Sequence, residues 1–138
     1  MKIIEVTEYS ADVEAAMARL LPQLSSSAKT PTTDEIRDLI ISKAPILFFA
    51  LDETDNVVGM LTLVVFRIPT GVRSWIEDVV VDASQRGKGV GEQLVCSAIE
   101  RAKAEGAKTV DLTSRPSREA ANRLYRRCGF QLRETNIY

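Results

Sequence analysis

The sequence predicts a single domain of the α+β class, in which helices pack against a mixed, mostly antiparallel sheet. Three apolar strand-like segments follow one another between Ile46 and Asp82 without a helix between them, which favours an antiparallel meander. Beyond Val90 the helical and strand patterns alternate, as in a βαβ unit. The expected order over residues 1–138 is β α α β β β α β α β.

Composition limits the class of protein. A chain of 138 residues with 45% apolar residues can bury a core without disulfides or a structural metal. A net charge of −1 gives no bulk attraction to nucleic acid or to anionic membranes, so neither is an expected partner. No apolar run is long enough to span a bilayer, and the N-terminus lacks the pattern of a signal peptide. A cytoplasmic location is therefore expected.

The first half contains two helical patterns. Apolar residues from Val13 to Leu21 recur at helical spacing, and the pattern predicts a helix that stops near Pro22. Thr32 and Glu35 have the spacing of a capping box and predict the start of a second helix, which ends before Pro45. The predicted strands of this half are Lys2–Thr7, Ile46–Leu51, Val57–Ile68 and Val72–Asp82.

The second half begins with a helix whose apolar face includes Leu94 and Ala98 and which Gly106 terminates. A short strand is predicted at Thr109–Thr113. Ser117 is the expected N-cap of a last helix, with Gly129 at its end. The predicted final strand is Phe130–Tyr138.

Three glycines stand at alternate positions between the strand that ends near Asp82 and the following helix: Gly87, Gly89 and Gly91. Arg86 and Lys88 flank them. Backbone N–H groups converge on anions at such strand–loop–helix junctions, so an anion site is favoured over a glycine-rich turn that binds nothing. The spacing fits neither the dinucleotide fingerprint nor the phosphate loop of nucleotide hydrolases.

The chain has no histidine, which excludes Cys–His and Ser–His nucleophiles and most zinc sites; no metal is expected. Proton transfer must then use Glu, Asp, Tyr, Lys or water. Cys96 and Cys128 are interpreted as small core residues. Spacing alone also favours a core role for Tyr125, because it lies on the apolar face of its helix.

The loop pattern Arg86-x-x-Gly89-x-Gly91 resembles the signature of the GNAT superfamily of acetyl-CoA-dependent N-acetyltransferases. The preceding IEDVVVD resembles the family's central strand, and Asn122–Phe130 (NRLYRRCGF) resembles its last helix and the strand that follows. The element order over nearly the whole chain is also similar to the family's. The resemblance implies that the strands at Val79–Val81 and Thr109–Thr113 splay apart, with the acetyl group of acetyl-CoA in the gap.

The resemblance also implies roles for individual residues. The coenzyme would be bound by Val79, Val80, Val81, Arg86, Gly87, Lys88, Gly89, Val90, Gly91, Glu92, Asn122 and Tyr125. Glu77, acting directly or through water, would deprotonate the acceptor amine. Tyr125 would protonate the departing thiolate, and a strand amide near Val79 would stabilise the oxyanion.

The expected acceptor is a small-molecule primary amine. An aminosugar is one candidate, because IEDVVVD and the arrangement around it resemble the aminosugar-phosphate branch of the family, but the acceptor residues of that branch do not map onto this sequence. A protein lysine or N-terminal amine is the alternative within the class, and a non-catalytic acyl-CoA-binding regulatory module is the alternative outside it. Homodimerisation is expected because only one strand follows the last helix where the family usually has two. The arginines of this region are interpreted as a solvated helix face, some of which hold the coenzyme's phosphates with Lys88: Arg115, Arg118, Arg123, Arg126 and Arg127.

Overall fold

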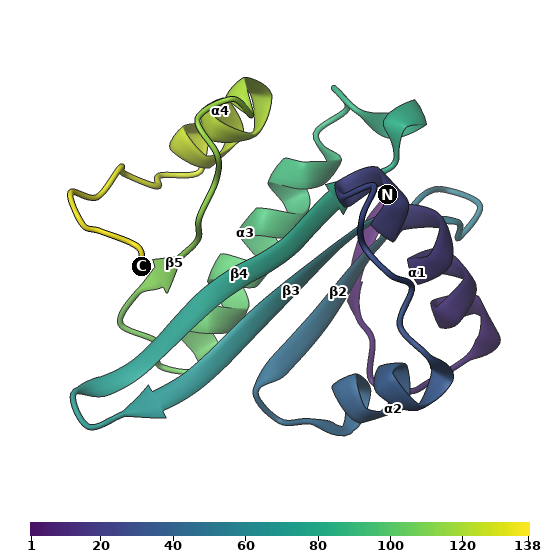
Figure 1. Ribbon diagram of the computed structural model, residues 1–138, viewed down its shortest axis with the longest axis horizontal. Helices are drawn as coiled ribbons and strands as arrows, with labels where there is room; N and C mark the ends of the chain where they lie inside the picture. The colour runs from purple at the N-terminus through teal and green to yellow at the C-terminus, as the bar shows by residue number, and fades with distance from the viewer.

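The computed structural model describes residues 1–138 as a central sheet with helices on both faces (Figure 1). The strands are β1 (Lys2–Glu5), β2 (Pro45–Leu51), β3 (Val57–Ile68), β4 (Gly71–Val81) and β5 (Val110–Asp111). The helices are α1 (Ala11–Leu24), α2 (Thr33–Ile41), the short 3-10 helix η1 (Ala83–Gln85), α3 (Val90–Ala104) and α4 (Glu119–Arg127). No helix combines the length and the apolar character that crossing a bilayer requires.

The strands form one sheet in the order β1-β2-β3-β4-β5. Neighbours from β1 to β4 are antiparallel, whereas β5 runs parallel to β4 after the crossover through α3. The antiparallel meander and the change to a βαβ unit are both confirmed. The chain is therefore an α+β protein with a mostly antiparallel, five-stranded sheet.

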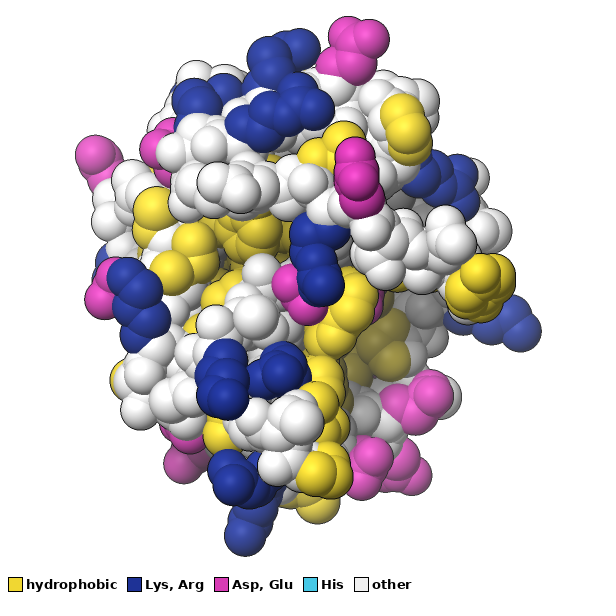
Figure 2. Space-filling view, turned by 90° about the vertical axis from the view of Figure 1, so that its left-hand side faces the viewer, with side chains coloured by type: hydrophobic (Ala, Val, Ile, Leu, Met, Phe, Trp, Pro, Cys, Tyr) yellow, Lys and Arg dark blue, Asp and Glu magenta, His cyan; other side chains and the backbone are white.

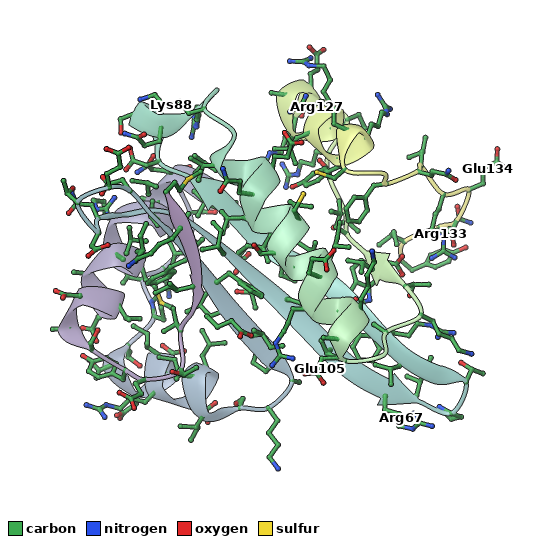
Figure 3. All side chains as sticks on the ribbon, turned by 180° about the vertical axis from the view of Figure 1, so that it is seen from behind. Arg67, Lys88, Glu105, Arg127, Arg133 and Glu134 are labelled. Atoms are coloured by element: carbon green, nitrogen blue, oxygen red, sulfur yellow. The ribbon has the colours of Figure 1, made fainter.

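Each face of the sheet has its own apolar core. Met17 and Leu20 of α1 and Ile36 of α2 pack on one face, against side chains such as Phe49. Figure 3 shows α3 crossing the opposite face. There Leu94, Val95 and Ala98 pack against Leu61 and Leu63 of β3, and Tyr125 of α4 completes this second core. Alternating side chains of the strands thus serve both layers, as their period of two dictates.

The strands β4 and β5 separate after a short contact. They pair only at Ser74 with Val110 and at Trp75 with Asp111. The strand predicted at Thr109–Thr113 is therefore shorter than expected. From Ile76 onward, the edge of β4 has no neighbouring strand on the β5 side.

The predicted final strand, Phe130–Tyr138, is wrong for this structure. These residues form no strand or helix, and Leu132, Ile137 and Tyr138 expose their side chains. A strand needs a neighbour for its backbone hydrogen bonds. Because β5 offers only a short edge, the apolar pattern of this segment has no strand to pair with.

Two helix boundaries also differ from expectation. Helix α1 continues past Pro22 to Leu24, because a proline in the last turn removes only its own N–H and the Ser25 N–H still reaches the Leu21 carbonyl. Helix α4 begins after Arg118 rather than after Ser117, and no side chain caps it. The capping box at Thr32 and Glu35 is confirmed.

Candidate active site

The glycine loop lies between β4 and the N-terminus of α3. Gly87 and Gly89 have φ angles of +78° and +81°, a region that L side chains rarely adopt, and Gly89 is the N-cap of α3. A Cβ atom added at either position would meet nothing within 4 Å, so close packing does not require these glycines. The loop surface is open to a ligand.

The backbone donors of this loop are free. None of the backbone N–H groups from Arg86 to Glu92 donates a hydrogen bond to another group of the protein, although the side chains of Arg86 and Lys88 do. The first turn of any helix leaves such donors unpaired, and the helix dipole adds positive potential at the same place. A run of free donors at the start of a 15-residue helix is a site for an anion such as a pyrophosphate.

Helix α4 lies against this end of α3. A Cβ atom at Gly91 would approach Leu124 Cδ1 to 2.9 Å, so this glycine allows the close contact of the two helices. In Figure 3, Lys88 and Arg127 lie at the same end of the molecule, on either side of the N-terminus of α3. Figure 2 shows dark-blue Lys and Arg side chains gathered over α4. Of the arginines from 115 to 127, only Arg127 contacts a carboxylate, that of Glu92 at 4.0 Å. The surroundings of the loop are therefore cationic.

Strand β4 contains a bulge beside this loop. Glu77 pairs with Thr62 and Val80 with Met60, so Asp78 and Val79 together oppose Leu61. Asp78 has a φ angle of +50°, and both Glu77 and Asp78 expose their side chains. In a regular strand the two acids would point to opposite faces. Bulges often redirect side chains next to active sites. The bulge therefore explains how two consecutive acidic residues can both be exposed within an apolar strand, which the sequence did not predict.

The open edge of β4 presents backbone groups at the level of the bulge. The Asp82 N–H donates to Val58 on β3, whereas the Val81 carbonyl turns away from β3 and accepts from Arg86 Nε at 3.4 Å. Alternate residues of a strand direct their backbone groups to the same side, so Val79 also faces the gap left by β5. An extended ligand can add to this edge like a strand.

Tyr125 lies on the second core near the gap. It is 8% exposed, and its ring meets that of Phe130 edge to face with a centroid distance of 6.0 Å. Its hydroxyl has no hydrogen-bond partner in the protein and is not fully enclosed. Burial raises the pKa of Tyr125, and the Arg118 charge opposes part of that rise. The phenol is therefore protonated at neutral pH and able to donate a proton.

The side chain of Asn122 makes one hydrogen bond within the protein. Its side-chain NH2 donates this hydrogen bond to the Arg115 carbonyl at 3.1 Å and closes the turn before α4, which leaves its side-chain carbonyl and its second N–H for a ligand. The hydroxyl of Ser114, after β5, is enclosed without a partner. Polar groups without a partner in the protein therefore occur both on the open edge of β4 and in the segment that follows β5.

The two cysteines differ from each other. Cys128 is half-buried, and burial raises the pKa of its thiol to about 11, so it is not a thiolate nucleophile near neutral pH. Cys96 is exposed, which corrects the expectation of a core residue. Its position follows the buried Val95 directly and falls outside the apolar stripe of α3.

The sequence did not predict the hydrogen bonds of Asp82, which lies directly before the glycine loop. Asp82 accepts hydrogen bonds from the Ser84 hydroxyl at 2.7 Å, the Ser84 N–H at 3.0 Å and the Arg19 guanidinium at 3.0 Å. The bonds from Ser84 first, then one from the Gln23 side chain at 3.3 Å and the charge of Arg19, lower the pKa of Asp82 from 3.8 to about 2. Asp82 follows β4 and caps η1, so it holds the start of the glycine loop.

The shifted pKa of Asp82 predicts a pH-dependent stability. Because the folded-state pKa lies below the unfolded one, ionised Asp82 stabilises the fold above pH 3.8, and this contribution is lost as the pH falls toward 2. Asp82→Asn should therefore unfold at lower urea concentration than the wild type at pH 7, and the difference should shrink below about pH 4. Ser84→Ala should show a smaller loss with the same pH trend. A difference that stays constant from pH 7 to pH 3 would contradict this origin.

Known proteins agree with the geometry. The family model described as Acetyltransferase (GNAT) family matches residues 13–130. An L-methionine sulfoximine/L-methionine sulfone acetyltransferase of Pseudomonas aeruginosa is 37% identical over 89 residues, which are 64% of this chain and 51% of that protein. Glucosamine 6-phosphate N-acetyltransferase 1 of Oryza sativa subsp. japonica is 40% identical over 55 residues, 40% of this chain and 32% of that protein. The matched segments span about half the length of these relatives or less.

Solved structures show the same fold. A protein titled a transcriptional regulator from Bacillus halodurans superposes with a TM-score of 0.81 at 26% identity, covering 99% of this chain and 98% of that one. An aminoglycoside acetyltransferase from an uncultured soil metagenomic sample superposes with a TM-score of 0.87 at 20% identity, covering 99% and 92%. With a family model that matches most of the chain, this protein belongs to the GNAT family of acetyltransferases.

Proposed function

We propose that this protein is an N-acetyltransferase that transfers the acetyl group of acetyl-CoA directly to a primary amine of a small molecule. The observation that supports it most is the run of free N–H groups from Arg86 to Glu92 next to the open edge of β4. A ligand that carries a pyrophosphate at one end and an amide-bearing arm at the other fits both features. Coenzyme A is such a ligand.

The donor would lie along α3 and β4. The N–H groups of the glycine loop would bind the pyrophosphate, with Lys88 adding positive charge. The backbone of Val79–Val81 would pair with the pantetheine arm, and the free side-chain carbonyl of Asn122 would accept a hydrogen bond from it. The thioester would then reach the gap between β4 and β5, near the Tyr125 hydroxyl.

The chemistry at the gap needs three groups. The amine nitrogen attacks the acetyl carbon, and a free strand N–H near Val79 stabilises the oxyanion. For this attack, Glu77 first removes a proton from the acceptor ammonium, directly or through water, so that the nitrogen has a free electron pair. The C–S bond then breaks, Tyr125 gives its proton to the sulfur, and the Tyr125 phenolate takes up the second proton, which the nitrogen loses as the amide forms. Glu77 suits the role of base because it is exposed beside the bulge. The protonated thiol of Cys128 favours direct transfer over an acyl-enzyme.

The acceptor is proposed to be a small amine, with aminosugar phosphates as first candidates. Both curated relatives described above are named for small amine substrates, glucosamine 6-phosphate in one case and a methionine derivative in the other. A regulatory module that binds acyl-CoA without turnover is the second candidate, because a structure at 26% identity is titled a transcriptional regulator.

A thiol-release assay with acetyl-CoA separates these functions. Glucosamine 6-phosphate, L-methionine sulfoximine and a lysine peptide serve as acceptors, and glucose 6-phosphate is the matched control without an amine. We expect thiol release with at least one small amine and none with glucose 6-phosphate, with the acetylated amine confirmed by mass spectrometry. Coenzyme A binding in calorimetry without thiol release from any acceptor would favour the regulatory module.

The proposal extends to a cytoplasmic homodimer. The short edge of β5 and the exposed Leu132, Ile137 and Tyr138 leave an apolar surface that a second copy would cover. Sedimentation should therefore give a dimer, and a monomer at assay concentrations would refute this part of the proposal.

A further inference from the structure

Helix α1 reaches across the molecule to the segment that begins the glycine loop. Arg19 donates to Asp82 at 3.0 Å and to the Val57 carbonyl at 2.7 Å. Gln23, one turn further along α1, donates to Asp82 at 3.3 Å and accepts from the Ala83 N–H at 2.8 Å. We call Arg19, Gln23 and Asp82, with the Ala83 N–H, the α1–loop clasp.

The clasp restrains the loop at its first residues. Val81 is the last residue of β4, and the segment from Asp82 to Gln85 leads directly into Arg86 and the free N–H groups. The far end of the loop is fixed by α3. Without the clasp, η1 would keep the hydrogen bonds that Asp82 makes with Ser84 and Gln85 and the one that the Gln85 side chain accepts from Lys88.

Stability of the fold alone does not account for this arrangement. The side chains of Arg19 and Asp82 are 47% and 18% exposed, and neither belongs to an apolar core. The bonds from Ser84, rather than those from Arg19, are the main cause of the lowered pKa of Asp82, and a partly exposed ion pair such as Arg19–Asp82 adds little to the free energy of unfolding by itself. A restraint on a binding loop instead reduces the ordering cost when the ligand binds, so its effect appears in affinity.

We propose that Arg19 and Gln23 are positioning residues for the anion-binding loop and act through Asp82. Helix α1, on the opposite face of the sheet from α3, is then a support of the coenzyme site. The inference rests on the proposed function for the identity of the ligand, which we take as coenzyme A.

The test compares Arg19→Ala and Arg19→Lys with the wild type in calorimetry with coenzyme A. Arg19→Ala should raise Kd about tenfold, as expected for the loss of a charge-assisted contact. Arg19→Lys retains a cation that can reach Asp82 and should give an intermediate Kd. The matched control is Arg101→Ala, because Arg101 bridges Glu5 and Glu105 at a similar exposure but far from the loop. It should leave Kd unchanged.

Steady-state kinetics provide a second test, because a residue that only stabilises the fold would not change the KM for acetyl-CoA selectively. Under the proposed function, Arg19→Ala should raise the KM for acetyl-CoA while kcat at saturating donor stays near the wild-type value. A lowered Tm with unchanged Kd, or equal Kd changes in Arg19→Ala and Arg101→Ala, would overturn the inference and leave the proposed function intact. A wild-type protein that binds no coenzyme A would instead overturn both. Coenzyme A binding without turnover would overturn only the enzymatic function, since Kd still tests the clasp.

Discussion

Replacing Tyr125 by phenylalanine is expected to lower kcat about a hundredfold, at the lower end of what general acid catalysis contributes. The variant removes only the hydroxyl, which makes no hydrogen bond to the protein. The ring, 8% exposed and packed edge to face on Phe130, would remain in place. Because burial raises the pKa of Tyr125, the wild-type phenol is available as an acid throughout the neutral range.

The measurement is the steady-state rate of thiol release, together with calorimetry to show that the Kd for coenzyme A is unchanged. Tyr9→Phe is the matched control, because it also removes one phenol hydroxyl, one that donates to Glu14 at 2.9 Å. Its kcat should stay near that of the wild type. A Tyr125→Phe enzyme with wild-type kcat across the pH range would remove Tyr125 from the mechanism.

Local sequence patterns predicted most of the fold. The capping box at Thr32 and Glu35 and the left-handed glycine at Gly106 after α3 both occur where the sequence places them. Such signals concern neighbours in the chain, so the local chemistry largely determines them. The apolar stripe of α3 packs on β3 for the same reason, since helical spacing alone selects the buried face.

Features that depend on distant partners were not predictable. The bulge at Asp78 and Val79 exists because β3 supplies one residue against two, a register that no single strand encodes. The bonds of Arg19 to Asp82 join residues 63 positions apart. The sequence around an exposed arginine on a helix does not indicate which residue it will contact. The contact between Arg19 and Asp82 could therefore be identified only from the structure.

In the C-terminal segment Phe130–Tyr138, by contrast, the sequence predicted a strand that the structure does not contain. The apolar residues of this segment suggested a strand, but a strand forms only where another offers free backbone groups along enough of its length. Strand β5 has two residues and offers too few free backbone groups for this. In the candidate site, the glycine pattern predicted the loop that precedes α3, and its role in binding coenzyme A stays a prediction. The hydrogen bond of Asn122 to the Arg115 carbonyl was not predicted, because it depends on how the turn before α4 folds.

Introducing a negative charge at Gly89 should abolish coenzyme binding without unfolding the protein. A side chain at this position enters open space, and aspartate is among the residues that tolerate the left-handed conformation observed at φ +81°. The carboxylate of Gly89→Asp would stand in the midst of the free N–H groups and repel a pyrophosphate. Two like charges about 4 Å apart near a protein surface repel by about 4 kcal/mol, which corresponds to a loss of roughly a thousandfold in affinity.

Two matched variants separate charge from shape and from backbone strain. Gly89→Asn has nearly the same size and the same tolerance of positive φ but no charge, so it should retain measurable binding of coenzyme A. Gly106→Asp places the same aspartate at φ +77°, also in open space, at the opposite end of α3, and should bind like the wild type.

Calorimetry with coenzyme A measures the affinity of all three variants, and thermal unfolding shows whether each is folded. A folded Gly89→Asp with wild-type affinity would show that the loop does not hold the phosphates, whereas equal losses in Gly89→Asp and Gly89→Asn would assign the effect to shape. Loss in the aspartate variant alone would make the anion's charge the property that this loop recognises.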